Sequence, residues 1–193
     1  LRNRGFQQIL GVEPAKDATE AARSKGVETV GSSFCVEVAE EIASASGQCD
    51  LLVARQVLEH VSDLEVFQKA MVTLLRPEGY VLIEVPNFAL NLTAHDYSAV
   101  WEEHVNYFTS QSLSRFLANV GIRIIHTETA NFCGEAFIVL GKYENGSATP
   151  LVGELNGSLR NQVISYRDRW PEFSTGIAQY LKGHQEAGEK VAV

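Results

Sequence analysis

The sequence predicts an α/β fold with a doubly wound, mostly parallel sheet and an antiparallel last strand. Short apolar runs alternate with helical patterns through the first two thirds of the 193 residues, and this alternation favours parallel strands covered by helices. The run 50–54 has a single polar residue, which is typical of a strand buried on both faces. Two strand-like runs, 122–129 and 135–143, are only five residues apart, so we expect them to pair antiparallel.

The predicted elements follow one another in a regular order. An S-x-x-E capping box of Ser62 and Glu65 predicts the start of one helix, and Pro77 and Gly79 predict a turn at its end. The segment 86–109 is predicted to be long and irregular, and loops of that length are usually functional. In chain order we expect a strand at 8–12, a helix at 19–25, a strand at 27–30, a helix at 36–46, a strand at 50–54, a helix through Leu64 to Leu74, a strand at 80–85, a helix at 110–121 and the two strands already named.

A change of composition at 144–150 divides the chain into two parts. Residues 1–143 are predicted to form the core, and residues 144–193 a helical connection that leads into a truncated second domain. The connection is expected to end near residue 185, and 188–193 to begin a new strand. Its apolar residues recur at helical spacing, at Val152, Leu155, Leu159, Val163, Tyr166 and Trp170.

Composition excludes several classes of protein. No apolar run approaches the ~20 residues of a membrane-spanning helix. The net charge is −8 and the basic residues are scattered, which makes nucleic acid a poor partner and leaves a small molecule as the expected one. Cys35, Cys49 and Cys133 form no C-x-x-C pair, so we expect no metal site, no disulfide framework and a cytoplasmic location.

An acidic residue directly follows the first predicted strand. Glu13 precedes Pro14 and a helix. Nucleotide-binding α/β proteins place an acidic group at a strand's carboxyl end, where it accepts hydrogen bonds from ribose hydroxyls. The position equally suits a surface residue that the helix dipole stabilises, so Glu13 alone leaves both interpretations open.

The stretch 49–87 carries a more specific pattern. An apolar strand led by Asp is followed by V-L-E-H at 57–60, by a helix that ends in L-L-x-P-x-G at 74–79, and by a buried strand. This order and spacing resemble class I S-adenosylmethionine-dependent methyltransferases, which have a Rossmann-like fold. The resemblance implies S-adenosyl-L-methionine as the cofactor. It also implies that the family's first strand and glycine-rich loop would lie before Leu1.

The resemblance assigns cofactor contacts to the ends of three strands. Glu13 would hold the ribose, and the segment after 50–54 would run beside the methionine portion. Ser33 stands near the place where many relatives have an acidic residue close to adenine, and a neutral hydroxyl would bind there more weakly. His60 falls in a packing turn, so we expect it to be structural. The predicted cofactor contacts are Glu13, Pro14, Ser33, Ala54, Arg55 and Gln56.

A second stretch, 97–113, has two carboxylates before a histidine and aromatic residues on both sides. It resembles the E-H-x-x-Y-F stretch of the deoxysugar C-methyltransferases, which methylate carbon beside the keto group of nucleotide-linked sugars. That carbon must first lose a proton, and histidine titrates close to neutrality. The resemblance assigns His104 as the base and Glu103 as its neighbour. The substrate contacts that it implies are Trp101, Asn106 and Tyr107.

Two departures from this subgroup leave the acceptor open. Trp101 stands where relatives have Tyr, and Phe132, Cys133 and Gly134 replace a His-Gly-Gly stretch. An NAD-type oxidoreductase remains an alternative, because a strand-end Glu13 would serve a nicotinamide ribose equally well. A non-catalytic protein that keeps a methyltransferase-like core is the other alternative.

Overall fold

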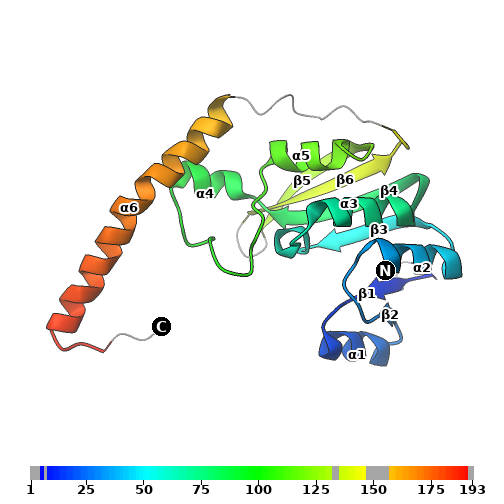
Figure 1. The fold of residues 1–193 in the computed structure, drawn as a ribbon, viewed down its shortest axis with the longest axis horizontal. Helices are drawn as coiled ribbons and strands as arrows, with labels where there is room; N and C mark the ends of the chain where they lie inside the picture. The colour runs from blue at the N-terminus through cyan, green and yellow to red at the C-terminus, as the bar shows by residue number, and fades with distance from the viewer. Residues whose placement is uncertain (1–4, 7, 132–134, 147–156, 191–193) are drawn as a thin grey trace.

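A computed structural model of the chain describes residues 5–6, 8–131, 135–146 and 157–190 (Figure 1). The strands are β1 (Leu10–Val12), β2 (Glu28–Val30), β3 (Cys49–Arg55), β4 (Leu75–Pro86), β5 (Ile122–Asn131) and β6 (Glu135–Tyr143). The helices are α1 (Lys16–Ser24), α2 (Val36–Ser46), α3 (Leu64–Leu74), α4 (Phe88–Ala94), α5 (Ser110–Ala118) and α6 (Gly157–Glu186), with a short 3-10 helix, η2 (Leu58–His60).

The strands form two sheets. β1 and β2 pair in parallel, and the larger sheet has the order β3-β4-β6-β5. β3 and β4 are parallel, whereas β6 runs antiparallel to both of its neighbours, β4 and β5. The predicted mostly parallel α/β fold with an antiparallel last strand is therefore confirmed.

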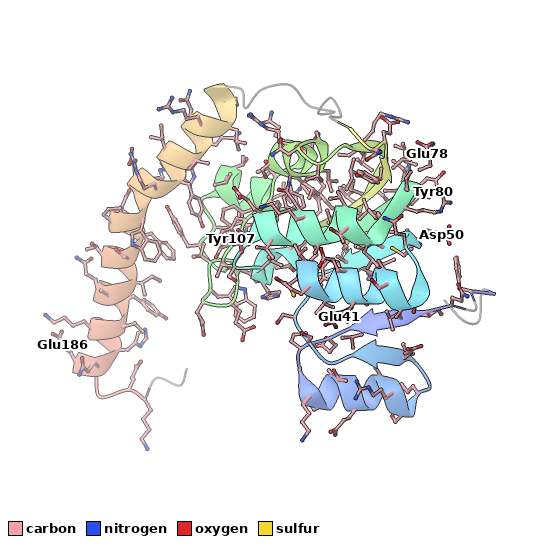
Figure 2. All side chains as sticks on the ribbon, turned by 45° about the vertical axis from the view of Figure 1, so that its right-hand side comes forward. Glu41, Asp50, Glu78, Tyr80, Tyr107 and Glu186 are labelled. Carbon is pink, nitrogen blue, oxygen red and sulfur yellow. The ribbon has the colours of Figure 1, made fainter. Side chains whose placement is uncertain are left out.

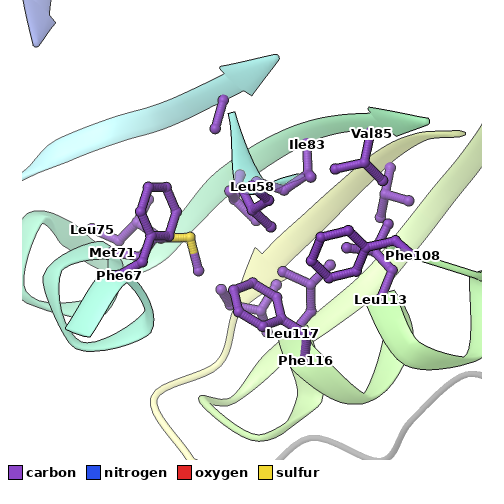
Figure 3. Packing of buried hydrophobic residues seen from close by; sticks show 14 residues of the cluster. Leu58, Phe67, Met71, Leu75, Ile83, Val85, Phe108, Leu113, Phe116 and Leu117 are labelled. Carbon is purple, nitrogen blue, oxygen red and sulfur yellow. The ribbon is translucent and has the colours of Figure 1, made fainter. Parts of the chain in front are cut away.

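The core lies between the larger sheet and the helices α3 and α5 (Figure 3). Apolar side chains at helical spacing on both helices meet the alternate residues of β4 that point to the same face. A second cluster joins α2 and α3 to β1, β2 and β3, so α2 connects the small sheet to the large one. The central residues of the main cluster are Leu58, Phe67, Met71, Ile83, Val85, Leu113 and Leu117.

Helix boundaries correct the sequence prediction at three places. The capping box of Ser62 and Glu65 is not formed, because Asp63 caps α3 and its carboxylate accepts hydrogen bonds from the backbone of Glu65 and Val66. β4 starts directly after α3, so Pro77 and Gly79 lie inside the strand. The segment predicted as irregular contains α4.

The long helix α6 differs from every other helix of the described chain because none of its residues is buried. It is confirmed as a helix at Gly157–Glu186, while the predicted positions Val152 and Leu155 lie outside the described residues, as do Phe132, Cys133 and Gly134. In Figure 1 it extends away from the sheets and approaches α4. Within the described residues no helix is long and apolar enough to cross a membrane.

Candidate active site

A cavity of about 850 Å³ opens beside the carboxyl ends of β3 and β4. η2, the end of β4, α4 and the segment between α4 and α5 supply its walls, and Figure 2 labels Tyr107 on that segment. Its lining combines aromatic rings, imidazoles, amides and carboxylates. The residues that line it are Gln56, Glu59, His60, Pro86, Asn87, Phe88, Leu90, Asn91, Asp96, Ser98, Ala99, Trp101, His104, Asn106, Tyr107, Phe108 and Glu135.

Two histidines stand against each other in this wall. The ring centroids of His60 and His104 are 4.9 Å apart, and Trp101 lies 4.9 Å from His104. His60 Nδ1 is 2.8 Å from the carbonyl oxygen of Glu103. Because a carbonyl oxygen only accepts, Nδ1 is the donor in this hydrogen bond, and in the tautomer with its proton on Nδ1 the lone pair is on Nε2.

The surroundings of His104 favour its neutral form. Burial lowers the pKa of His104, the neighbouring His60 lowers it further, and Glu103 opposes the shift. An imidazole that is neutral near physiological pH can accept a proton or bind a metal ion.

Backbone hydrogen bonds fix the segment that carries His104. The amides of Val105 and Asn106 both donate to the carbonyl oxygen of Glu59, at 2.9 and 3.1 Å. The side-chain nitrogen of Asn106 donates to the carbonyls of Leu58 and Val61, at 3.0 and 2.6 Å. Asn106 thus lines the cavity and also ties this segment to η2.

Glu59 is not among the site residues predicted from the sequence, yet its side chain is one of the most buried in the described chain. It is 1% exposed, and neither of its carboxylate oxygens has a hydrogen-bond partner among the described residues. Burial is the main cause that raises the pKa of Glu59. In the sequence it is one acidic residue of the V-L-E-H run, and nothing in that run indicates that its carboxylate is buried.

Glu84 is equally buried at the end of β4 but fully paired. Arg55 Nε lies 2.6 Å from Glu84 Oε2, and Gln56 Nε2 donates to Glu84 Oε1 at 3.2 Å. The hydrogen bond from Arg55 is the main cause that lowers the pKa of Glu84. Gln56 directly follows β3 with φ of 52°, a left-handed conformation at the point where the chain leaves the sheet.

Glu13 stands at the carboxyl end of β1, as the sequence predicts. Its Oε1 accepts a hydrogen bond from the Ala15 amide at 2.8 Å. Among the described residues its other carboxylate oxygen has no recorded partner, so it can accept from a ligand. In Figure 1 the arrows of β1 and β3 point toward the same side of the molecule.

The cavity brings together five of the residues that the sequence predicts for cofactor and substrate. Gln56, Trp101, His104, Asn106 and Tyr107 line it. The remaining predicted contacts are not among its lining residues, and their roles stay predictions. They are Glu13, Pro14, Ser33, Ala54, Arg55 and Glu103.

Aromatic residues join the cavity to α6. Tyr97 donates its hydroxyl to the carbonyl of Tyr166 at 2.6 Å, and Tyr166 donates to the carbonyl of Asp96 at 2.9 Å. Burial raises the pKa of Tyr166 to about 12, so the donor keeps its proton. Phe88 packs between Tyr107 and Tyr166, which connects the cavity wall to the helix.

Comparison with known proteins identifies methyltransferases among the relatives of this chain. The family described as methyltransferase domain matches residues 1–127. The C-methyltransferase NovU of Streptomyces niveus is 30% identical over an alignment of 194 positions that covers 96% of this chain and 46% of that protein. A ubiquinone biosynthesis O-methyltransferase of Azorhizobium caulinodans is 29% identical over an alignment of 99 positions that covers 48% of this chain and 39% of the relative. The chain thus spans less than half the length of these two relatives.

Solved structures share the fold at low sequence identity. A SAM-dependent methyltransferase from Anabaena variabilis is 14% identical with a TM-score of 0.57, over 74% of this chain and 70% of that one. A SAM-dependent methyltransferase from Thermotoga maritima is 17% identical with a TM-score of 0.54, over 68% of this chain and 72% of that one. These similarities concern the fold alone.

Proposed function

This chain belongs to the methyltransferase domain family, and from that premise we propose that the protein methylates a carbon atom beside a keto group, with S-adenosyl-L-methionine as the methyl donor. The observation that carries the proposal is the His104 imidazole, which lies in the wall of the cavity at the ends of β3 and β4 and whose pKa is lowered by burial. NovU, which is similar over nearly the whole chain, is itself a C-methyltransferase by name.

The strand ends of this chain fit the proposed cofactor. Glu13 has a carboxylate oxygen without a recorded partner among the described residues, and ribose hydroxyls are donors that such an oxygen accepts. Gln56 presents its side chain at the cavity, next to the end of β3. When bound, S-adenosylmethionine supplies an electrophilic methyl group. Pro14, Ser33, Ala54 and Arg55 remain proposed contacts of the same ligand.

His104 acts as the general base in this proposal. Its neutral imidazole takes the proton from the carbon beside the keto group, and the C–H electron pair passes to the carbonyl as an enolate. The enolate carbon would then form the new C–C bond to the methyl group as the S–C bond breaks. The electron pair of the S–C bond would go to sulfur. His104 holds the proton until solvent removes it.

The acceptor class we propose is a nucleotide-linked deoxysugar with a keto group. Trp101 and Tyr107 offer ring surfaces and one N–H or O–H donor each, which suits a sugar ring. Three carboxylates line the cavity, and no Lys or Arg is among its described lining residues. The phosphate groups of such a substrate would therefore remain outside the cavity while the sugar enters it.

Mass spectrometry and NMR of the product test the proposal. The full-length protein is incubated with S-adenosylmethionine and nucleotide-linked 4-ketosugars, and the expected product carries one new methyl group on carbon. Since general-base catalysis contributes about 100-fold or more, His104→Gln should slow the reaction at least that much.

His126→Gln is the matched control, because His126 is an exposed histidine of β5 outside the cavity. Its rate should equal that of the wild type. A methyl group found on oxygen would contradict carbon transfer, and an unchanged rate of His104→Gln would eliminate the proposed base.

A further inference from the structure

Three side chains in the cavity wall converge in a way that base catalysis does not require. One nitrogen or oxygen atom from each of Glu59, His60 and His104 lies within 4.8 Å of the corresponding atoms of the other two. We propose that these three residues form a binding site for a divalent transition-metal ion of the zinc type. The inference does not depend on the proposed methyl transfer, although both involve His104.

The distances are close to those of a metal site. Zinc bonds to imidazole nitrogen and carboxylate oxygen are about 2.0–2.2 Å long, so the ligand atoms of one ion lie no more than roughly 4 Å apart. Ligand atoms within 4.8 Å of one another need only a small rotation of the side chains to reach that spacing.

The burial of Glu59 is the second, independent observation. A carboxylate removed from water without a partner is costly, and buried charges in proteins are normally paired or bound to a metal. Glu59 is 1% exposed, and both of its oxygens lack hydrogen-bond partners among the described residues. The described lining of the cavity offers no Lys or Arg to compensate it, so a bound cation would supply the missing partner.

His60 has the arrangement that a metal-ligating histidine needs. A ligating histidine typically donates its other ring N–H to a carbonyl or carboxylate, which fixes the ring and its tautomer. His60 does so through Nδ1, to the carbonyl of Glu103. The backbone hydrogen bonds from Val105 and Asn106 to Glu59 hold the two ligand-bearing segments together without any ion.

The ligand types select the class of metal. Two imidazoles and one carboxylate suit zinc and similar ions, whereas magnesium and calcium prefer oxygen ligands. Three protein ligands leave a fourth position open, here on the side of the cavity. A lone pair of His104 that binds the metal cannot accept a proton, so the metal-bound and the proton-accepting states of His104 exclude each other.

Calorimetric titration with zinc chloride tests the site. The full-length protein is first treated with EDTA, and any separate zinc site that stays occupied is counted by elemental analysis. In addition to any zinc that stays bound after EDTA treatment, we expect one zinc ion to bind per chain. Glu59→Gln should weaken its binding by about tenfold or more, and His104→Gln should do the same.

Glu102→Gln is the matched control, because Glu102 is an exposed carboxylate on the same segment. Its zinc affinity should be unchanged. Circular dichroism checks that the variants fold, and cobalt substitution gives a visible spectrum that His104→Gln should alter. No binding of this ion, or equal affinity in wild type and both site variants, would overturn the proposal.

Assays of methyl transfer with EDTA and with added zinc distinguish the metal site from the proposed function. Activity in EDTA that zinc inhibits would support both proposals. Activity in EDTA without any zinc binding would overturn the metal site alone. Zinc binding without methyl transfer to any ketosugar would overturn the proposed function alone.

Discussion

Two carboxylates are buried near the same cavity, and their surroundings could hardly differ more. At the end of β4, Glu84 is 2% exposed and accepts hydrogen bonds from Arg55 and Gln56. In η2, Glu59 is 1% exposed and has no side-chain partner among the described residues. The pKa of Glu84 is lowered, mainly by the hydrogen bond from Arg55, while burial raises that of Glu59. Two equally buried carboxylates therefore differ in their partners. Glu84 accepts hydrogen bonds from side chains, whereas Glu59, the proposed metal ligand, accepts none among the described residues.

The largest expected effect on stability comes from Arg55→Met, which would leave Glu84 with the hydrogen bond from Gln56 but, like Glu59, without a cation. The methionine keeps much of the side-chain packing but leaves the buried carboxylate without its cation. A hydrogen bond to a charged group contributes about 1.5–3 kcal/mol, and because Arg55 is more than half exposed, we expect a loss of about 1–2 kcal/mol. Urea unfolding measures it.

Arg76→Met is the control for this loss. Arg76 pairs with Asp50, but Asp50 is 83% exposed, so water can replace the partner. The loss should be clearly smaller than for Arg55→Met. Equal losses in the two variants would mean that burial of Glu84 does not matter.

The stabilisation by the Glu84–Arg55 pair should decrease as the pH falls. Its pKa is lower in the folded than in the unfolded chain, where a glutamate titrates near about 4.3. The stabilisation is therefore complete above that pH and is lost as the pH falls through the folded pKa. Unfolding of wild type and Glu84→Gln, compared from about pH 7 to pH 3, should show a difference that shrinks with acid. A constant difference would contradict the pairing.

The smallest effect is expected for Glu59→Gln in the absence of metal. The amide has nearly the same shape and carries no charge, so it removes an unpaired ionisable group and breaks no recorded side-chain hydrogen bond. The free energy of unfolding should change by less than about 1 kcal/mol. A loss as large as that of Arg55→Met would show that the Glu59 carboxylate has a stabilising partner.

The fold was largely accessible from the sequence because its elements carry strong local patterns. The apolar run in β3, the short interval between β5 and β6 and the apolar spacing of α6 all predicted the observed elements. The expected burial of the β3 run on both faces is wrong, because β3 lies at the edge of its sheet and Ala54 is its one buried residue. The other errors concern the start of α3, the start of β4, where Pro77 and Gly79 were expected to form a turn, and the presence of α4. A one-residue change of cap, from Ser62 to Asp63, depends on backbone conformation that a sequence does not show.

The site was accessible only in part. His104 and Tyr107 stand in a recognisable motif, and both line the cavity. Glu59 was missed because its burial arises when a segment more than forty residues later folds over η2. His60, expected to be structural, has its ring against His104 in the same wall, a contact between segments that no local pattern reveals.

The bonds that tie residues 105–106 to the Glu59 carbonyl are made by main-chain amides. Every amino acid except proline offers such an amide, so these two hydrogen bonds do not depend on which side chains line the cavity. Evolution can therefore exchange Val105, or reshape the neighbouring wall at Trp101, while the imidazoles keep their positions. In the proposed function, such a scaffold would let the acceptor change while the imidazoles stay in place.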